Sequence, residues 1–125
     1  MHTILIALTM TSNTVPFYPG IEFDDLQMIY AESPSGLIQQ LQAHNDADLV
    51  MLSLEMALDD DLSALSEIRR INASLPVILM ARTITVQAVR LAVMLGCKEI
   101  MQYPMDNQTF RAIIDKYTNV KETNN

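Results

Sequence analysis

The stretch Asp48-Leu49-Val50-Met51-Leu52-Ser53-Leu54-Glu55-Met56 decides the fold of this chain. Between residues 49 and 53, four of the five side chains are apolar, and no helical or alternating period is visible. A short apolar run of this kind is typical of a central β-strand that is buried on both faces. The carboxyl end of such a strand is where α/β sheets place their chemistry, so the sequence first raises the question of what Ser53 does there.

Length and composition predict a single domain and exclude several functions. The 125 residues suffice for one hydrophobic core, and 50% of them are apolar. A net charge of -7, from 15 acidic and 8 basic residues, argues against direct binding to nucleic acid or to an anionic membrane. The single cysteine, Cys97, excludes an intrachain disulfide and fits a cytoplasmic location, where we expect an inert packed thiol.

Four further apolar runs predict the remaining strands, and the stretches between them show helical signals. The predicted strands cover residues 3–8, 26–31, 76–81 and 98–103. The expected helix signals are the caps Ser33, Thr83 or Thr85, and Asp106 or Asn107, the acidic cluster at 59–61, and the stop at Gly96.

Strands that alternate with helices predict an α/β fold with a parallel sheet. We expect a flavodoxin-like doubly wound sheet of five strands in the order 2-1-3-4-5, with helices on both faces. The expected domain covers residues 1–118, and residues 119–125 form a polar tail or the start of a linker. Prolines and a glycine between Thr9 and Asp25 predict that the first helix is short or irregular, with Phe17, Tyr18 and Phe23 covering the sheet.

From about residue 3 to residue 117, the chain resembles the receiver (CheY-like) domain of bacterial response regulators. Three stretches carry this resemblance, namely Asp48 to Leu62, Leu75 to Arg82, and Ala92 to Met105. They occur in the order and at the spacing of the receiver family's central strand, fourth strand and fifth strand. The resemblance implies a role in two-component (phosphorelay) signal transduction.

In receivers, an aspartate accepts a phosphoryl group, carboxylates hold Mg²⁺, a lysine pairs with the phosphoryl oxygens and a hydroxyl transmits the signal. Carried over by position, the acidic pair falls on Leu8 and Thr9, and the phosphoacceptor falls on Ser53. The hydroxyl falls on Ala81 and the lysine on Tyr103. None of these residues supplies the required group. We therefore expect a degenerate pseudo-receiver that is not an enzyme and has no metal and no cofactor. Ser53 could also be a nucleophile, but no neighbouring motif supplies a base and no Gly-x-Ser-x-Gly elbow is present. We therefore favour a small polar residue that the backbone satisfies.

The resemblance also implies a docking face on the last two helices and the last strand, for a protein partner or for a homodimer. Adaptable methionine side chains suit such a face. Its candidate residues are Arg90, Met94, Ile100, Met101, Tyr103 and Phe110, with Met105 nearby. Receivers hold the bond before the corresponding proline in the cis form, so we predict a cis bond between Tyr103 and Pro104.

The sequence leaves three hypotheses for the function of this chain. The leading hypothesis is a phosphorylation-independent, receiver-like regulatory and interaction module of a two-component type system. The first alternative is the N-terminal atypical receiver of a larger protein, such as a Tad-type pilus-localisation ATPase or a transcriptional regulator. The second alternative is a small ligand-binding flavodoxin-like domain with a pocket at Thr9, Ser12, Ser53 and Ala81. The glycine-rich loop that a phosphate site requires is missing from the first loop, which argues against this last alternative.

Overall fold

The structure of the protein is a computed structural model that describes residues 2–8, 23–103 and 105–118. The strands in these residues are β1 (His2–Ala7), β2 (Leu26–Ala31), β3 (Leu49–Ser53), β4 (Val77–Ala81) and β5 (Glu99–Gln102). The helices are α1 (Pro34–Ala43), α2 (Leu54–Asp59), α3 (Ser63–Ile71), α4 (Val86–Met94) and α5 (Asn107–Thr118).

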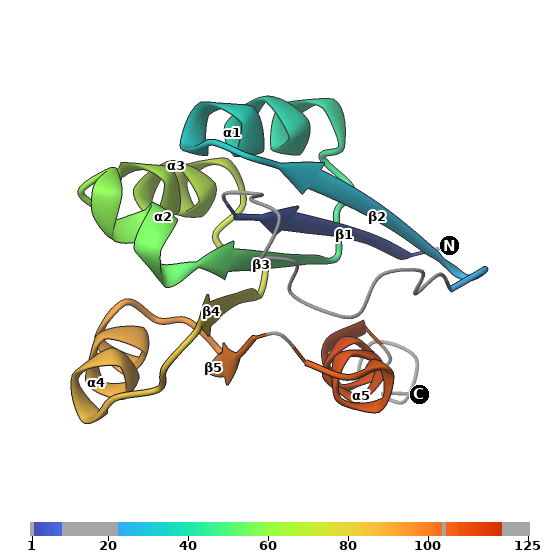
Figure 1. Cartoon of the computed structure of the whole chain (residues 1–125). Coiled ribbons are helices and arrows are strands. Elements are labelled where there is room, and N and C mark those ends of the chain that lie inside the picture. The colour runs from blue at the N-terminus through green and yellow to red at the C-terminus, as the bar shows by residue number, and fades with distance from the viewer. Residues whose placement is uncertain (1, 9–22, 104, 119–125) are drawn as a thin grey trace.

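The five strands form one parallel sheet in the order β2-β1-β3-β4-β5 (Figure 1). Along the chain, β3 follows β2 but pairs with β1, where Val50 lies opposite Leu5, and with β4, where Leu52 lies opposite Leu79. In the described residues, α1 to α4 cover one face of the sheet and α5 covers the other (Figure 1). The predicted flavodoxin-like doubly wound fold is therefore confirmed.

The central strand β3 divides the hydrophobic core into two halves. All five of its residues are buried. Because side chains alternate along a strand, Val50 and Leu52 pack beneath α1 and α3, whereas Leu49 and Met51 pack on the side of α5. A strand with apolar residues on both faces stays out of water only between two layers of helices. The apolar run that predicted β3 thus also explains the layered architecture.

The polar residues at the helix ends act largely as predicted. The hydroxyl of Ser33 accepts a hydrogen bond from the Gly36 amide at 3.0 Å, and the hydroxyl of Thr85 accepts one from Ala88 at 3.0 Å. The Asp106 carboxylate accepts a hydrogen bond from Thr109 at 2.7 Å. Gly96 follows α4 with a φ of +72°, a left-handed conformation in which a glycine ends a helix without strain.

The sequence did not reveal α2, which begins directly where β3 ends. Its apolar residues continue those of the strand, so no change of period marks the boundary. The acidic cluster lies between α2 and α3, where Asp60 accepts a hydrogen bond from the Ala64 amide at 2.8 Å. This contact satisfies one of the free amides at the start of α3, the role expected for the cluster.

The segment expected to hold a short or irregular first helix lies mostly outside the described residues, as do Phe17, Tyr18 and the tail at 119–125. Phe23 is described, and its ring stacks on that of Phe110 with centroids 5.9 Å apart. Phe110 is fully buried on the α5 side of the sheet. The stack fastens the segment before β2 to α5.

Arg111 reinforces the same junction between β2 and α5. Its guanidinium donates to both carboxylate oxygens of Asp25, at 2.7 and 2.5 Å, and to Asp115 at 3.0 Å. It also lies 5.4 Å from the centre of the Phe23 ring. The hydrogen bond from Arg111 lowers the pKa of Asp25 from 3.8 to about 2.

Replacing Phe110 with alanine should lower the free energy of unfolding by about 3–5 kcal/mol, because a large buried ring is lost and a cavity remains. Thr109→Ala changes an exposed neighbour in the same helix and should stay within about 0.5 kcal/mol of the wild type. Urea unfolding of the three proteins measures both effects. Equal stabilities for the two variants would contradict the described core.

The contact between Asp25 and Arg111 should also make stability depend on pH. A carboxylate with a lowered pKa stabilises the fold above its unfolded pKa, near 3.8 here, and this contribution is lost as the pH falls through about 2. Asp25→Asn should therefore flatten this part of the pH profile of unfolding free energy. Asp24→Asn, which alters the exposed neighbouring carboxylate, should leave the profile unchanged. Parallel profiles for wild type and Asp25→Asn would refute the assignment.

Candidate functional site

Four of the five degenerate receiver positions meet at the carboxyl edge of the sheet. Ser53 ends β3 and Ala81 ends β4, whereas Leu8 and Tyr103 directly follow β1 and β5. The Tyr103 amide donates to the Ala81 carbonyl at 3.0 Å, which continues the pairing of β4 and β5. The exposed fractions of Leu8, Ser53, Ala81 and Tyr103 are 1, 3, 5 and 4%. This edge is closed by packing, and the fifth position, Thr9, lies outside the described residues.

Ser53 has a structural partner. Its hydroxyl accepts a hydrogen bond from the Met56 amide at 3.3 Å and so caps the first turn of α2. This contact confirms the interpretation of Ser53 as a polar residue that the backbone satisfies. It also explains why the sequence places serine between a buried strand and a helix, since a hydroxyl can satisfy an amide at the start of α2 that has no partner within the helix.

Tyr103 fills the place at which receivers have a lysine. Its ring packs in the half of the core that includes Phe110, Met80 and Leu8. The Arg82 guanidinium lies 5.8 Å from the centre of this ring, within the range of a cation–π contact. The Tyr103 ring itself supplies no cation for a phosphoryl group, and the nearby Arg82 guanidinium lies against the ring.

The Mg²⁺ site of a receiver does not fit these residues. Hard divalent cations need several oxygen ligands, above all carboxylates. Leu8, Ala81 and Tyr103 provide no carboxylate, and the Ser53 hydroxyl is engaged with Met56. In the described part of the chain, no three His, Cys, Asp or Glu side chains gather as a metal site would require.

The predicted docking face needs a correction. Tyr103 and Phe110 are 4 and 0% exposed, so they belong to the core and cannot line a surface. Phe110 points inward because it shares its helical stripe with Ile113 and Ile114, which pack on the sheet. Arg90 is exposed, Met94 is 81% exposed, and Ile100 and Met101 are half-buried. Met105 is buried, and the predicted cis bond involves Pro104, outside the described residues.

The exposed apolar residues that the sequence analysis missed lie on α4. Val86, Val89 and Val93 follow helical spacing and are 70, 42 and 73% exposed. We call these three residues and Met94 the α4 face. The α4 sequence is apolar nearly all round, yet only Ala88 and Ala92 are buried. A helix with this pattern usually packs against a second apolar surface. That signal was present in the sequence, but the buried side of α4 could not be told from its exposed side.

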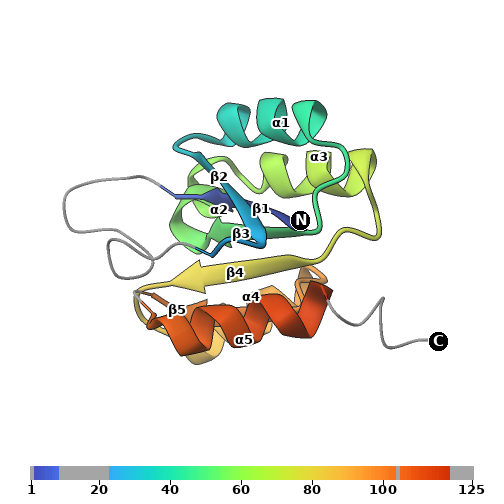
Figure 2. The same ribbon diagram turned by 90° about the vertical axis from the view of Figure 1, so that its right-hand side faces the viewer.

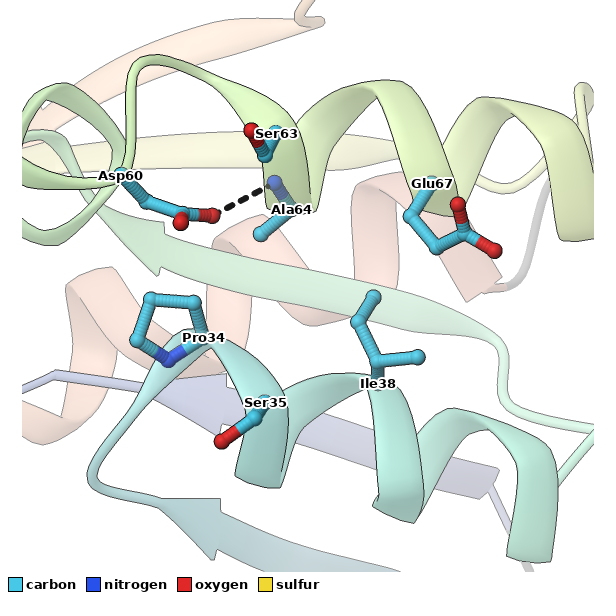
Figure 3. Close-up of a pocket in the computed structure, with 7 residues that line it drawn as sticks. All are labelled: Pro34, Ser35, Ile38, Asp60, Ser63, Ala64 and Glu67. Atoms are coloured by element: carbon cyan, nitrogen blue, oxygen red, sulfur yellow. Dashed lines mark hydrogen bonds between the residues drawn. The ribbon is translucent and has the colours of Figure 1, made fainter.

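A second surface feature lies between α1 and the junction of α2 and α3. Here a groove of about 260 Å³ runs between the first turns of α1 and α3, with Pro34 and Ile38 facing Asp60 and Glu67 (Figure 3). A neighbouring hollow of about 310 Å³ shares Pro34 and Asp60. We call the two together the α1–α3 groove. Its lining residues are Glu32, Ser33, Pro34, Ser35, Ile38, Met56, Asp59, Asp60, Ser63, Ala64 and Glu67.

Neither the groove nor the lone cysteine lies at the closed edge of the sheet. A further hollow of about 480 Å³ lies between Phe23 and α5. Ser53 and Ala81 line none of these hollows. Burial raises the pKa of the half-buried Cys97 thiol, which favours the unreactive protonated form that the sequence predicted. No helix in the described residues has the length and apolar character needed to cross a membrane.

Comparison with protein families gives a match over most of the chain. The model described as Orn/Lys/Arg decarboxylase, N-terminal domain, matches residues 19–115. The chain belongs to this family. A search of curated protein sequences gives no significant match to this chain.

Solved structures show that this chain shares the receiver fold. A response regulator receiver domain protein from Clostridium thermocellum is 21% identical with a TM-score of 0.76, over 98% of both chains. A two-component response regulator from Clostridium difficile is 15% identical with a TM-score of 0.73, over 100% of both chains. A CheY-like protein (tadZ) from Pseudomonas aeruginosa is 19% identical with a TM-score of 0.64, over 94% of both chains. These structures confirm the resemblance at the level of the fold.

Removing the Ser53 hydroxyl tests its role as a cap. Ser53→Ala should lower the free energy of unfolding by about 1 kcal/mol, because a buried amide of α2 loses its partner. Ser63→Ala is the matched control, since Ser63 is exposed at the start of α3, and should stay within about 0.5 kcal/mol. Denaturant unfolding measures the free energy of unfolding of both variants and of the wild type. A Ser53→Ala variant as stable as the control would show that the cap contributes nothing.

Proposed function

We propose that this chain is a non-enzymatic interaction and regulatory domain that uses the receiver fold without aspartyl phosphorylation. The closed edge of the sheet is the observation that carries the proposal. At the position of the phosphoacceptor stands Ser53, buried and engaged with the Met56 amide. At the position of the lysine stands the buried Tyr103. Phosphoryl transfer to Ser53 would place negative charge among buried apolar side chains, where Tyr103 offers no cation to balance it.

A receiver fold remains stable more easily when all charged groups of the phosphorylation site are replaced together than when only one of them is replaced. A single carboxylate or lysine left at this edge would be a buried unpaired charge, which destabilises a protein strongly. Leu8 and Tyr103 instead add apolar contacts to the half of the core on the side of α5, and Ala81 is buried as well. The domain thereby keeps the scaffold and leaves its surfaces for binding.

The surface that supports a binding role is the α4 face. Its three valines and Met94 are the largest group of exposed apolar side chains on one element of the described residues. Arg90 lies on the same helix, so the α4 face and this residue retain two of the six residues predicted for docking, while Ile100 and Met101 of β5 are half-buried. An apolar face rimmed by polar groups is typical of a protein–protein contact. We assign the binding of a protein partner to this face.

The family match favours one setting for this role. As a member of the Orn/Lys/Arg decarboxylase N-terminal domain family, the chain would act beside a decarboxylase of ornithine, lysine or arginine, in its assembly or its regulation. This setting agrees with the hypothesis of an N-terminal domain in a larger protein. It differs from the two examples expected from the sequence, a Tad-type ATPase and a transcriptional regulator. The alternative setting is a two-component type system, which the similar structures named response regulators favour. Both settings are cytoplasmic in this proposal.

Incubation with acetyl phosphate and Mg²⁺ tests independence from phosphorylation. We expect the intact mass of the chain to stay unchanged, while a receiver with its aspartate and lysine in place gains a phosphoryl group. The Ser53→Asp variant should also stay unmodified, because Leu8 and Tyr103 still supply neither metal ligand nor cation. A phosphoryl adduct of any kind on the wild type would overturn the proposal.

A further inference from the structure

Charge is divided unevenly along the chain. All 8 Lys and Arg residues lie at or after Arg69, whereas 11 of the 15 Asp and Glu residues come before it. The first part of the chain includes α1, α2 and most of α3, and the second part includes α4 and α5. Figure 2 shows α1 and α3 at one flank of the molecule and α4 and α5 at the other. We call the flank of α1 and α3 the acidic flank for its carboxylates Glu32, Asp59 and Asp60, although Arg69 and Arg70 of α3 also lie there. We call the flank of α4 the basic flank for Arg82, Arg90 and Lys98.

The α4 face lies on the basic flank. Arg82, Arg90 and Lys98 are exposed on α4 and in the segments at its two ends, and none of them pairs with a carboxylate among the described residues. Ile84, in the segment that leads into α4, is 37% exposed. This flank thus offers an apolar ridge with a cationic border.

The α1–α3 groove lies on the acidic flank and has the opposite character. Its apolar lining includes Pro34, Ile38 and Met56, and the nearby Leu58 of α2 is 49% exposed. Glu32 and Asp59 are exposed at its rim. A groove with an apolar floor and an anionic rim complements a helix with an apolar ridge and a cationic border.

We propose that the α4 face of one copy of this chain docks in the α1–α3 groove of a second copy. The proposal rests on the proposed function, because it names the partner of the α4 face. The contact is head-to-tail, so a pair of bound copies still has one free α4 face and one free groove. Further copies can add at these two ends, and assembly continues into a ring or an open chain.

Charge favours this contact over a symmetric one. In a dimer that joins two α4 faces, Arg90 and the neighbouring Arg82 and Lys98 would meet the same cations of the partner, and like charges across an interface are unfavourable. The net charge of -7 also opposes random association of copies. The head-to-tail contact instead brings the basic flank of one copy to the acidic flank of the next. It therefore differs from the homodimer that the receiver resemblance implies.

Self-association should be weak and sensitive to salt. One helix face buries less area than a permanent interface, and exposed charges contribute to the attraction. Sedimentation velocity of the wild-type chain over a range of concentrations should show species that grow beyond a dimer or stop at a ring. Raising the salt concentration should shift the distribution back toward the monomer. A chain that remains monomeric at the highest soluble concentration in low salt overturns the proposal.

Two variants each remove one half of the contact. Val86→Glu with Val93→Glu places charge on the α4 face, and Glu32→Lys with Asp59→Lys reverses the rim of the groove. Each pair should weaken self-association by about tenfold or more. All four side chains are exposed, and glutamate and lysine are good helix formers, so the fold should persist. Circular dichroism and urea unfolding verify this.

The controls carry the same changes of charge at other exposed positions. Ala43→Glu with Ala73→Glu matches the α4 variant, and Asp24→Lys with Asp46→Lys matches the groove variant. Both controls should associate as the wild type does. Weakening of equal size in a control and in its matched variant would show that net charge alone governs association, which would overturn the proposal.

Mixing the two variants distinguishes the head-to-tail contact from a symmetric one. The α4 variant retains an intact groove, and the groove variant retains an intact α4 face, so an equal mixture should form a one-to-one complex that grows no further. A symmetric dimer through α4 would form no such complex and would persist in the groove variant alone, and either result would overturn the proposal. The acetyl phosphate experiment is independent of assembly, so the proposed function can stand when this inference fails.

Discussion

The burial of β3 between two layers of helices is the constraint on which the rest of the structure depends. Its side chains alternate between the half of the core under α1 and α3 and the half on the side of α5. Because both faces are apolar, each must be covered, and because its neighbours β1 and β4 run parallel to it, every connection must cross over the sheet. The packing of β3 therefore places Ser53, at its carboxyl end, at the edge of the sheet where a receiver has its phosphoacceptor.

That carboxyl end is packed with apolar side chains at positions where the receiver resemblance places charged groups. Apolar side chains at Leu8, Ala81 and Tyr103 complete the core at the edge, and Ser53 uses its hydroxyl for a helix cap. The energetic logic favours this joint replacement, since a charge that survives alone in a buried place is more destabilising than an apolar group of similar size. The edge that distinguishes receivers from other doubly wound domains has become part of the packing.

The surface of α4 differs from the closed carboxyl edge of the sheet, because it leaves apolar side chains exposed. Helix α4 contributes only two alanines to the core and leaves three valines and Met94 in contact with solvent. The cations beside α4 and the carboxylates at the α1–α3 groove lie apart in the folded molecule, because the sheet order keeps α1 and α3 on one flank and α4 and α5 on the other. An apolar face with a basic border and a groove with an acidic rim are thus fixed on a single scaffold. Both belong to a domain of the Orn/Lys/Arg decarboxylase N-terminal family.

The sequence by itself determined the strands and most helix ends, because apolar periodicity and caps such as Ser33 and Thr85 are local properties. The strand order followed from the alternation of five strands with helices, which is typical of a doubly wound sheet. The sequence did not reveal α2, since the apolar residues of β3 continue into that helix without a change of period. Only the tertiary structure decided that Tyr103 and Phe110 are buried while Val86 and Val93 are exposed. All four are apolar residues near the same strand and helices, and which of them meets solvent depends on how α4 and α5 rotate against the sheet, which long-range packing sets.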